Sequence, residues 1–194
     1  MEPQDRIIRH FTDHAETAHH SLSLLGDRIA QVANRMSECL VNDGKILCCG
    51  NGGSATESQH LSSELLNRFE RDRPGLPAIP LTADMATITS IANDYCYEEI
   101  FAKQIRALGH AHDILVVYTT SGNSKNLFNA VNAAHDRDMS VVLMNGKDGG
   151  ALAPLLRESD FELRVPSMRT AHVQEMHLLI THCICDLIDH HLFG

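Results

Sequence analysis

Short apolar runs alternate with stretches of helical length throughout the chain after Gly44. Continuous apolar runs of about four to eight residues, bounded by turn-forming residues, are typical of strands that are buried on both faces of a sheet. The five runs occupy residues 45–49, 78–81, 113–118, 140–144 and 161–165. Because strands that alternate with helices pair in parallel through right-handed crossovers, the pattern predicts an α/β fold with a five-stranded parallel sheet flanked by helices.

Helical periodicity accounts for most of the remaining chain. Between the predicted strands, helices are expected over 54–69, over 85–92 continuing through 98–108, over 124–137 and in a short piece at 151–156. Two amphipathic helices are predicted before the first strand, over 8–22 and 29–40, and a final helix over 170–191 is apolar around much of its circumference. Since one small sheet does not need this much apolar surface, we expect the N-terminal and C-terminal helices to pack across subunits of an oligomer.

The length of 194 residues and the hydrophobic share of 43% predict one compact domain over 1–194. Its helical segment is expected over 1–43, and its sheet with the covering helices over 44–194. Lys and Arg number 16 against 25 Asp and Glu, and the resulting net charge of −9 argues against a protein that grips nucleic acid or a membrane through a basic surface. A small solute or a protein partner is expected instead.

Neither a signal peptide nor a membrane span is expected, because residues 1–10 lack an apolar segment and no run of 18 apolar residues occurs. This pattern predicts a cytoplasmic protein, in which the six cysteines are reduced. Their spacing fits no common metal motif, so all six are predicted to be small core residues. Most of the 13 histidines are predicted to be solvated, namely His10, His14, His19, His20, His110, His112, His135, His190 and His191.

Two loops follow the first and third predicted strands, at the edge of a parallel sheet where ligands bind. The first is Gly50-Asn51-Gly52-Gly53-Ser54, whose glycines allow the backbone to approach a polar ligand and whose serine can cap the next helix. A tight strand-to-helix turn explains these residues about as well. The second is Thr119-Thr120-Ser121-Gly122-Asn123-Ser124, where hydroxyl groups and backbone amides at a helix N-terminus favour a phosphate-monoester site over a plain capped turn.

Two of the predicted helices carry candidate metal ligands and proton-transfer groups. His60 and Glu64 share one helix face and could hold a divalent ion, or Glu64 could act as a general base, although an exposed helix pair is the commoner arrangement. On the last helix, Glu175 and His182 lie nearly in line, whereas Gln174 and His182 differ by about 80° around the axis and about 12 Å along it. Spacing therefore does not choose between Gln174 and Glu175. A kinked start or another chain would be needed to bring both ends of this helix to one ion.

Four motifs, in this order along the chain, resemble the sugar isomerase (SIS) domain family. They are Cys-Gly-Asn-Gly-Gly-Ser-Ala at 49–55, Thr-Ser-Gly-Asn-Ser at 120–124, Gly-Lys-Asp-Gly-Gly at 146–150, and Gln174-Glu175-x-His177. Within that family, the chain resembles the bacterial phosphoheptose isomerases over essentially its whole length. The resemblance implies a single SIS domain, an aldose/ketose sugar-phosphate isomerase, and a homotetramer with sites near the subunit interfaces.

The resemblance also implies which residues form the site. Substrate would be bound by Asn51, Gly52, Gly53, Glu64, Asn93, Asp94, Thr119, Thr120, Ser121, Ser124 and Gln174. One zinc ion per subunit would be held by His60, Glu64, Gln174 and His182, which selects Gln174 over Glu175. Isomerases of this family often have Ser where this chain has Thr119, which keeps the hydroxyl and adds a methyl group.

The implied reaction converts D-sedoheptulose 7-phosphate to D-glycero-D-manno-heptose 7-phosphate through a cis-enediol, as the first step toward ADP-heptose for the lipopolysaccharide core. Glu64 would be the catalytic base that moves a proton between C1 and C2, and His182 the acid at the carbonyl oxygen. One alternative is a non-catalytic tetramer like the related protein that binds the replication initiator DnaA. That relative lacks the glutamate and the final histidine of the metal set, so Glu64 and His182 favour an enzyme. Another alternative is a different SIS activity, such as isomerisation of an aminosugar phosphate.

Overall fold

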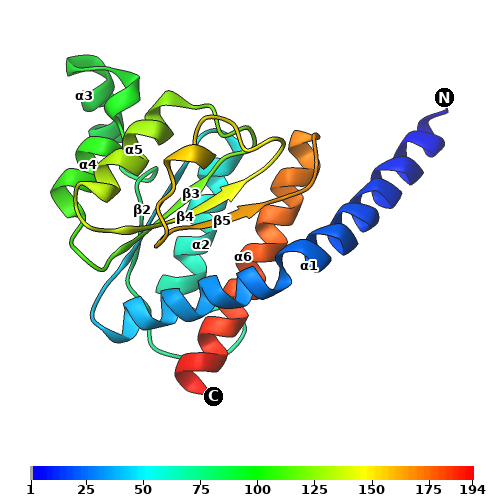
Figure 1. The fold of residues 1–194 in the computed structure, drawn as a ribbon, viewed down its shortest axis with the longest axis horizontal. Coiled ribbons are helices and arrows are strands. Elements are labelled where there is room, and N and C mark those ends of the chain that lie inside the picture. Colours follow the sequence, from blue (N-terminus) through cyan, green and yellow to red (C-terminus); the bar gives the residue numbers. More distant parts are fainter. Residues whose placement is uncertain (1) are drawn as a thin grey trace.

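The computed structural model describes residues 2–194, and these form an α/β fold built on one parallel five-stranded sheet (Figure 1). The strands are β1 (Ile46–Gly50), β2 (Ala78–Pro80), β3 (Ile114–Tyr118), β4 (Ser140–Asn145) and β5 (Phe161–Arg164). Each lies within two residues of the run that predicted it, because uninterrupted apolar sequence marks strands buried on both faces.

The strand order β2-β1-β3-β4-β5 creates a switch point between β1 and β3. The chain leaves β1 for β2 on one side, then crosses back to β3 on the other side. β1 and β3 pair along their whole lengths, from Ile46 beside Ile114 to Gly50 beside Tyr118. Because the two connections depart in opposite directions, a crevice opens at the carboxyl ends of β1 and β3, which is where open α/β sheets bind their ligands.

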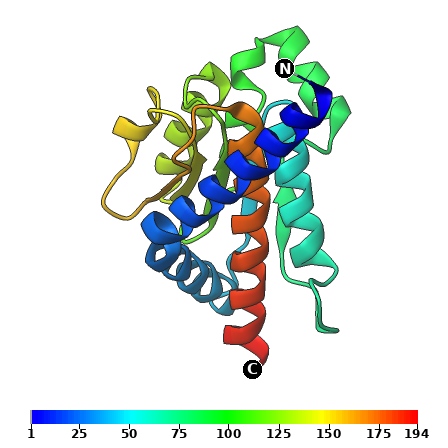
Figure 2. The ribbon, with the colours of Figure 1, turned by 90° about the vertical axis from the view of Figure 1, so that its right-hand side faces the viewer.

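Helices cover both faces of the sheet. They are α1 (Pro3–Val41), α2 (Gly53–Leu66), α3 (Met85–Asp94), α4 (Ala102–Leu108), α5 (Lys125–His135) and α6 (Thr170–Phe193), with 3-10 turns at Tyr97–Glu99 and Ala153–Leu155. Apolar residues of α1, α2 and α6 pack in one core with Cys48 and Val116, whereas α3, α4 and α5 pack in a second core with Leu47 and Leu115. Successive strand residues thus face opposite layers, and α1, α2 and α6 lie side by side on one of them (Figure 2).

The prediction of two N-terminal helices was wrong, because α1 is a single helix of 39 residues. Gly26 lies between the two predicted helices, and a lone glycine lowers helix stability by only about 1 kcal/mol relative to alanine. The half of α1 beyond Gly26 packs against α6 and the sheet, and this packing stabilises α1 as one continuous helix.

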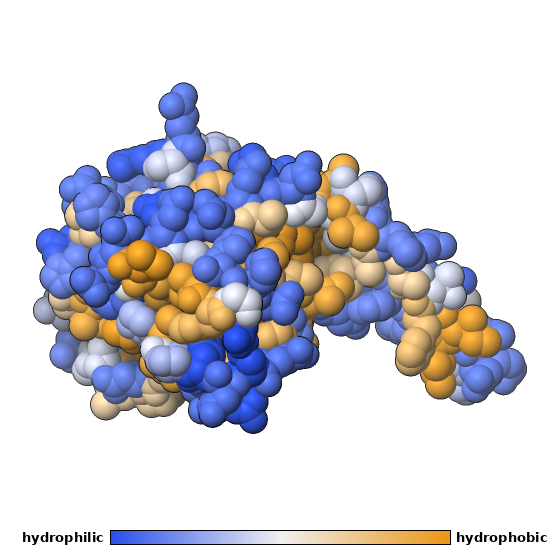
Figure 3. Space-filling model, turned by 90° about the horizontal axis from the view of Figure 1, so that it is seen from below, coloured by the Kyte–Doolittle hydropathy of each residue, from blue (hydrophilic) through white to orange (hydrophobic). Residues whose placement is uncertain are grey.

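The first turns of α1 project from the body of the protein (Figure 1), whereas Asp13 and His14, later in its first half, contact Arg169 and Glu175 at the start of α6. Apolar side chains are exposed along the first turns, including Ile7, Ile8 and Phe11, of which Phe11 is 75% exposed (Figure 3). Within residues 2–194, no helix has the length and apolar character needed to cross a membrane.

Three side chains differ in burial from their predicted environment. Cys96 is half-buried and Cys183 is exposed, so the prediction that all six cysteines are core residues was wrong for these two. His135 is buried rather than solvated, because its Nε2 lies 2.8 Å from Asp160 Oδ2. The other oxygen of that carboxylate accepts the Val141 amide, so a loop acid supplies a buried partner that the sequence around His135 does not reveal.

Candidate active site

A cavity of about 210 Å³ opens at the switch point between β1 and β3. Its lining includes side chains from the loops after both strands and from the start of α6: Asn51, Ser54, Thr119, Thr120, Ser121, Ser124 and Gln174. Six of these seven are residues that the family resemblance assigned to substrate, and they come from three segments far apart in sequence. We call this the hydroxyl cavity.

The loop after β3 presents hydroxyl groups at the N-terminus of α5. Ser124 is the N-cap residue, and its side chain makes no capping hydrogen bond, so its hydroxyl is available to a ligand. Gly122 has a φ of +66°, and a Cβ there would collide with the backbone of Gly149. The Gly122 amide donates to Thr119 Oγ1 at 3.1 Å, so this hydroxyl also stabilises the loop. Exposed hydroxyls and a helix N-terminus together suit a phosphate group.

The loop after β1 holds Asn51 through partners that the sequence did not predict. Asn51 and Asn126 exchange two amide hydrogen bonds of 2.8 and 2.9 Å, and Tyr97 donates its hydroxyl to Asn51 Oδ1 at 3.0 Å. Ser54 was wrongly predicted to cap the next helix, because α2 begins at Gly53 with Gly52 as its N-cap, and Ser54 lines the hydroxyl cavity instead.

Gln174 stands between the hydroxyl cavity and a second cavity of about 370 Å³ that is also lined by Gly53, Glu57, His60 and Glu175. Gln174 packs so closely on the start of α2 that a Cβ on Gly53 would overlap its amide group. The Glu175 carboxylate instead lies 2.8 Å from His14 Nδ1 of α1. The two residues that helix spacing left undecided are therefore in different environments.

Three residues of the implied zinc set lie together between α2 and α6. His60 Nε2 lies 2.9 Å from His182 Nε2 and 3.4 Å from Glu64 Oε1. Two imidazole nitrogens in contact can share only one proton, so one of them presents a lone pair to the other. This arrangement can transfer a proton and has the donor chemistry of a zinc site.

Gln174, the fourth implied ligand, does not join this cluster by a kink in α6. Helix α6 runs from Thr170 through His182 without a break, so eight residues of rise separate Gln174 from His182 by about 12 Å along the axis. Among residues 2–194, no three or more His, Cys, Asp and Glu side chains are arranged to hold a metal ion.

Asn93 and Asp94 are not brought to the hydroxyl cavity. Both are exposed at the end of α3, where the Asn93 amide donates to Asp94 Oδ1 at 2.8 Å. Tyr97, three residues after Asp94, is the residue of this segment that reaches the site, through its bond to Asn51.

A buried acid–histidine pair beside the second cavity was also missed. Glu57 Oε2 lies 3.6 Å from Nδ1 of the fully buried His177, and neither atom has a hydrogen-bond partner in the described chain. His177 Nε2 lies 3.0 Å from the carbonyl oxygen of Asn145, at the end of β4. His177 belongs to a motif that the sequence singled out, but a position in a helix does not reveal which partner a side chain meets.

Burial controls the titration of the groups beneath the site. It raises the pKa of Tyr118 well above its ordinary value, and the Tyr118 hydroxyl bonds Thr181 Oγ1 at 2.8 Å. Burial, reinforced by the charge of Glu64, raises the pKa of Cys185 to about 12. Both groups are therefore neutral at physiological pH, which leaves the carboxylates and imidazoles as the proton-transfer groups of the site.

The fold and this arrangement of loops define an SIS-domain protein, and an SIS-domain family model matches residues 10–146. The phosphoheptose isomerase of Methylococcus capsulatus is 62% identical over 194 residues, which cover 100% of both chains. The structure of a phosphoheptose isomerase from Francisella tularensis superposes with a TM-score of 0.96 at 49% identity, covering 98% of this chain and 100% of that chain. A phosphoheptose isomerase structure from Neisseria gonorrhoeae gives a TM-score of 0.92 at 44% identity, covering 97% of this chain and 100% of that chain.

The chain belongs to the phosphoheptose isomerase family, whose members are sugar-phosphate isomerases. The expected family, fold class and enzyme class are thereby confirmed. These comparisons give no support to the alternative of a regulator that binds DnaA.

Proposed function

We propose that this chain converts D-sedoheptulose 7-phosphate to D-glycero-D-manno-heptose 7-phosphate. The observation that carries the proposal is the position of Gln174, which lines both the hydroxyl cavity and the neighbouring cavity that contains His60. A phosphate in the first cavity leaves the carbon chain of a sugar free to extend past Gln174 toward the proton-transfer groups. The names of the relatives support a seven-carbon sugar phosphate as the substrate.

The phosphate would be held by the loop after β3. Thr120, Ser121 and Ser124 line the cavity there, and the N-terminus of α5 adds its partial positive charge. A helix N-terminus binds an anion without a lysine, so the net charge of −9 does not oppose a phosphorylated substrate. Asn51, which is held by Asn126 and Tyr97, would orient the sugar beside this loop.

Proton transfer would be carried out by Glu64 and His182, whose side chains both lie within 3.4 Å of His60 Nε2. Glu64 removes a proton from C1 of the ketose while His182 gives a proton to the oxygen on C2, which produces the enediol. Glu64 then returns a proton to C2, and the hydroxyl on C1 loses its proton to His182 as the aldehyde forms. Each group ends in its starting state, as general acid/base catalysis requires.

Zinc is part of the proposal and would be held by His60, Glu64 and His182 with Gln174 as the fourth ligand. Because unbroken α6 keeps Gln174 about 12 Å along its axis from His182, a Gln174 supplied by another chain would complete the set. Two histidines and a carboxylate are a common donor set for catalytic zinc, and three of the four residues already lie together. When bound, the ion would polarise the carbonyl group of the substrate. Metal analysis of the purified protein, with a His60→Gln variant as the comparison, tests this part independently of turnover.

We further propose a homotetramer that acts in the cytoplasm and supplies the lipopolysaccharide core pathway. The exposed apolar side chains of the projecting first turns of α1, Ile7, Ile8 and Phe11, support packing against another copy. All six cysteines lie in the described part of the chain and carry free thiols, and a reducing compartment would keep them in that state.

The experiment that tests the function is an assay of purified protein with sedoheptulose 7-phosphate and, in parallel, with an aminosugar phosphate. We expect turnover of the heptulose phosphate, sensitivity of that turnover to a chelator, and little turnover of the aminosugar phosphate. Preference for the aminosugar phosphate would replace the proposed substrate. Capture of DnaA without turnover of either sugar would replace the proposed enzyme by the regulator.

A further inference from the structure

We propose that Arg73 is a positioning residue for Glu64, acting through the backbone at the end of α2 and anchored by Asp189 of α6. Arg73 lies in the loop between α2 and β2, whose residues 71–77 include two prolines and one glycine. The inference rests on the role of Glu64 in the proposed function.

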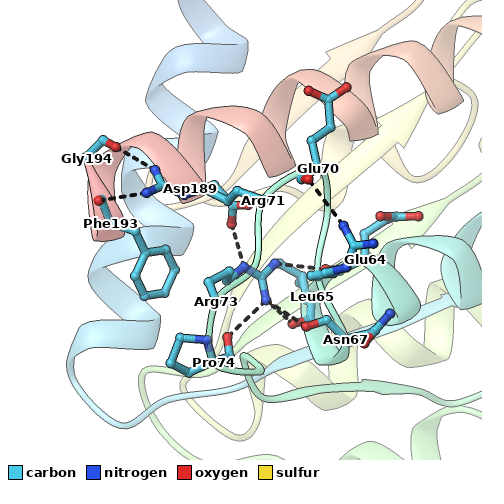
Figure 4. Close-up of polar contacts among 11 residues, drawn as sticks. Glu64, Leu65, Asn67, Glu70, Arg71, Arg73, Pro74, Asp189, Phe193 and Gly194 are labelled. Atoms are coloured by element: carbon cyan, nitrogen blue, oxygen red, sulfur yellow. Dashed lines mark hydrogen bonds and ion pairs between the residues drawn. The ribbon is translucent and has the colours of Figure 1, made fainter.

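The Arg73 guanidinium is buried against α2 and α6 (Figure 4). The side chain of Arg73 is 1% exposed and that of Asp189 is 5% exposed, and Arg73 Nε donates to Asp189 Oδ1 at 2.7 Å. Long charged side chains are seldom buried so completely without a specific set of partners. This pair therefore fixes the orientation of the guanidinium.

Two further donors of Arg73 point at the end of α2, and Nη1 also donates to the carbonyl oxygen of Pro74 at 3.1 Å. Nη2 donates to the carbonyl oxygen of Glu64 at 2.8 Å, and Nη1 donates to that of Leu65 at 2.7 Å. Helix α2 ends at Leu66, so these carbonyls belong to its last turn, where intrahelical donors run out. A cation at a helix C-terminus also stabilises the helix dipole. Arg73 thus orders the turn that carries Glu64.

The same pair ties this turn to the helix that carries His182. Asp189 follows His182 by seven residues on α6, so both face the same side of that helix. Besides the contacts of α6 with Gly53 and Glu57 farther back on α2, His60 makes one contact near Glu64 with His182, and Arg73, in the loop after α2, makes a second with Asp189. Losing the second contact would leave Glu64 on a frayed helix end, free to move relative to His182.

The neighbouring Arg71 provides a matched control. It lies in the same loop, but its guanidinium donates to the carbonyl oxygens of Phe193 and Gly194 at the end of α6 rather than to α2 (Figure 4). An effect of lost charge in this loop would appear in both variants, whereas an effect on the last turn of α2 would appear only at Arg73.

The test compares Arg73→Gln with Arg71→Gln by kcat, by KM, and by hydrogen exchange of the amides at the end of α2. A displacement of about 1 Å can cost about 100-fold in rate, so we expect Arg73→Gln to lower kcat about 10- to 100-fold and to speed exchange over residues 63–67. KM should stay within about threefold, because the phosphate loop lies on other elements, and Arg71→Gln should match the wild type. In a Glu64→Gln background, Arg73→Gln should reduce kcat by less than about threefold, because coupled residues are non-additive.

A folded Arg73→Gln protein with unchanged kcat or unchanged exchange would overturn the inference. An equal further loss of kcat in the Glu64→Gln background would also overturn it, since the effect would not pass through Glu64. If Arg73→Gln does not fold, Asp189→Asn and Arg73→Lys carry the same comparisons. If the wild-type protein does not isomerise the heptulose phosphate, the proposed function fails by itself, and the exchange measurement still decides whether Arg73 orders this turn.

Discussion

Replacing Gly53 with alanine should damage the site without destabilising the fold. Gly53 has no positive φ and opens α2, so alanine suits its backbone, and helix propensity changes stability by less than about 1 kcal/mol. The added Cβ, however, would overlap Nε2 of Gln174 and crowd its Cδ and Oε1 at 3.1 and 3.3 Å, so the amide group must move away. Since a displacement of about 1 Å can cost about 100-fold in rate, we expect kcat/KM to fall about 100-fold, or about 2.7 kcal/mol of transition-state stabilisation.

The assay measures kcat/KM for sedoheptulose 7-phosphate and denaturant unfolding on the same preparations. Gly26→Ala is the matched control, because its Cβ would meet only Leu22 Cδ1, at 3.7 Å, and it should gain about 0.5–1 kcal/mol of stability with unchanged activity. In a Gln174→Ala background, Gly53→Ala should cost nothing further, because the amide that it displaces is gone. Wild-type kcat/KM in Gly53→Ala, or an equal loss in the Gln174→Ala background, would refute the reasoning.

Three further outcomes are expected. Asp160→Asn removes the carboxylate that pairs with the buried His135, so it should lower the free energy of unfolding by about 3 kcal/mol and Tm by roughly 6–12 °C. The control Asp136→Asn, at an exposed position, should change the free energy of unfolding by less than about 0.5 kcal/mol, and equal effects of the two variants would contradict the role of the pair. Phe11→Ser should lower the sedimentation coefficient because it favours smaller oligomers, and an unchanged coefficient would show that the exposed apolar face of α1 is not part of the subunit interface. Burial, with a smaller effect of nearby charge, raises the pKa of the Cys39 thiol to about 11, so the thiol loses its proton at lower pH in the unfolded chain than in the folded one. The free energy of unfolding should therefore decline between about pH 9 and 11, and the decline should be smaller in Cys39→Ala. Identical declines in the two proteins would contradict this role of Cys39.

The sheet and the place of the site follow from local patterns in the sequence. Each strand is a continuous apolar run, and the alternation of strands with helices allows few topologies. The loops after β1 and β3 then had to meet, because β1 and β3 are neighbours at the switch point. The hydroxyl cavity confirms that these loops adjoin, and Thr120, Ser121 and Ser124 line it.

The partners of individual side chains could not be predicted from spacing. Asn51 is held by Tyr97 and Asn126, which come from a 3-10 turn and from α5. Arg73 donates to the last turn of α2 from a loop whose sequence does not reveal that contact. Such contacts depend on the tertiary arrangement of elements distant in sequence, and periodicity carries no information about them.

The continuity of α1 was also decided by tertiary contacts. A glycine at position 26 was consistent with either a turn or one long helix, since its cost in a helix is only about 1 kcal/mol. Packing of the second half of α1 on α6 decided in favour of the helix. The first turns of α1, before the contacts of Asp13 and His14 with α6, then extend past the fold, which exposes the apolar face bearing Phe11.

The most direct measurement is turnover of sedoheptulose 7-phosphate by the Glu64→Gln variant. Glutamine keeps the shape of the side chain but removes the carboxylate that lies 3.4 Å from His60, and with it the proposed base. General acid/base groups typically contribute about 10²- to 10⁴-fold, so we predict a loss of that size with the oligomer and the fold unchanged. Wild-type turnover in a correctly folded Glu64→Gln protein would contradict the assignment of Glu64 and, with it, the proposed route of proton transfer.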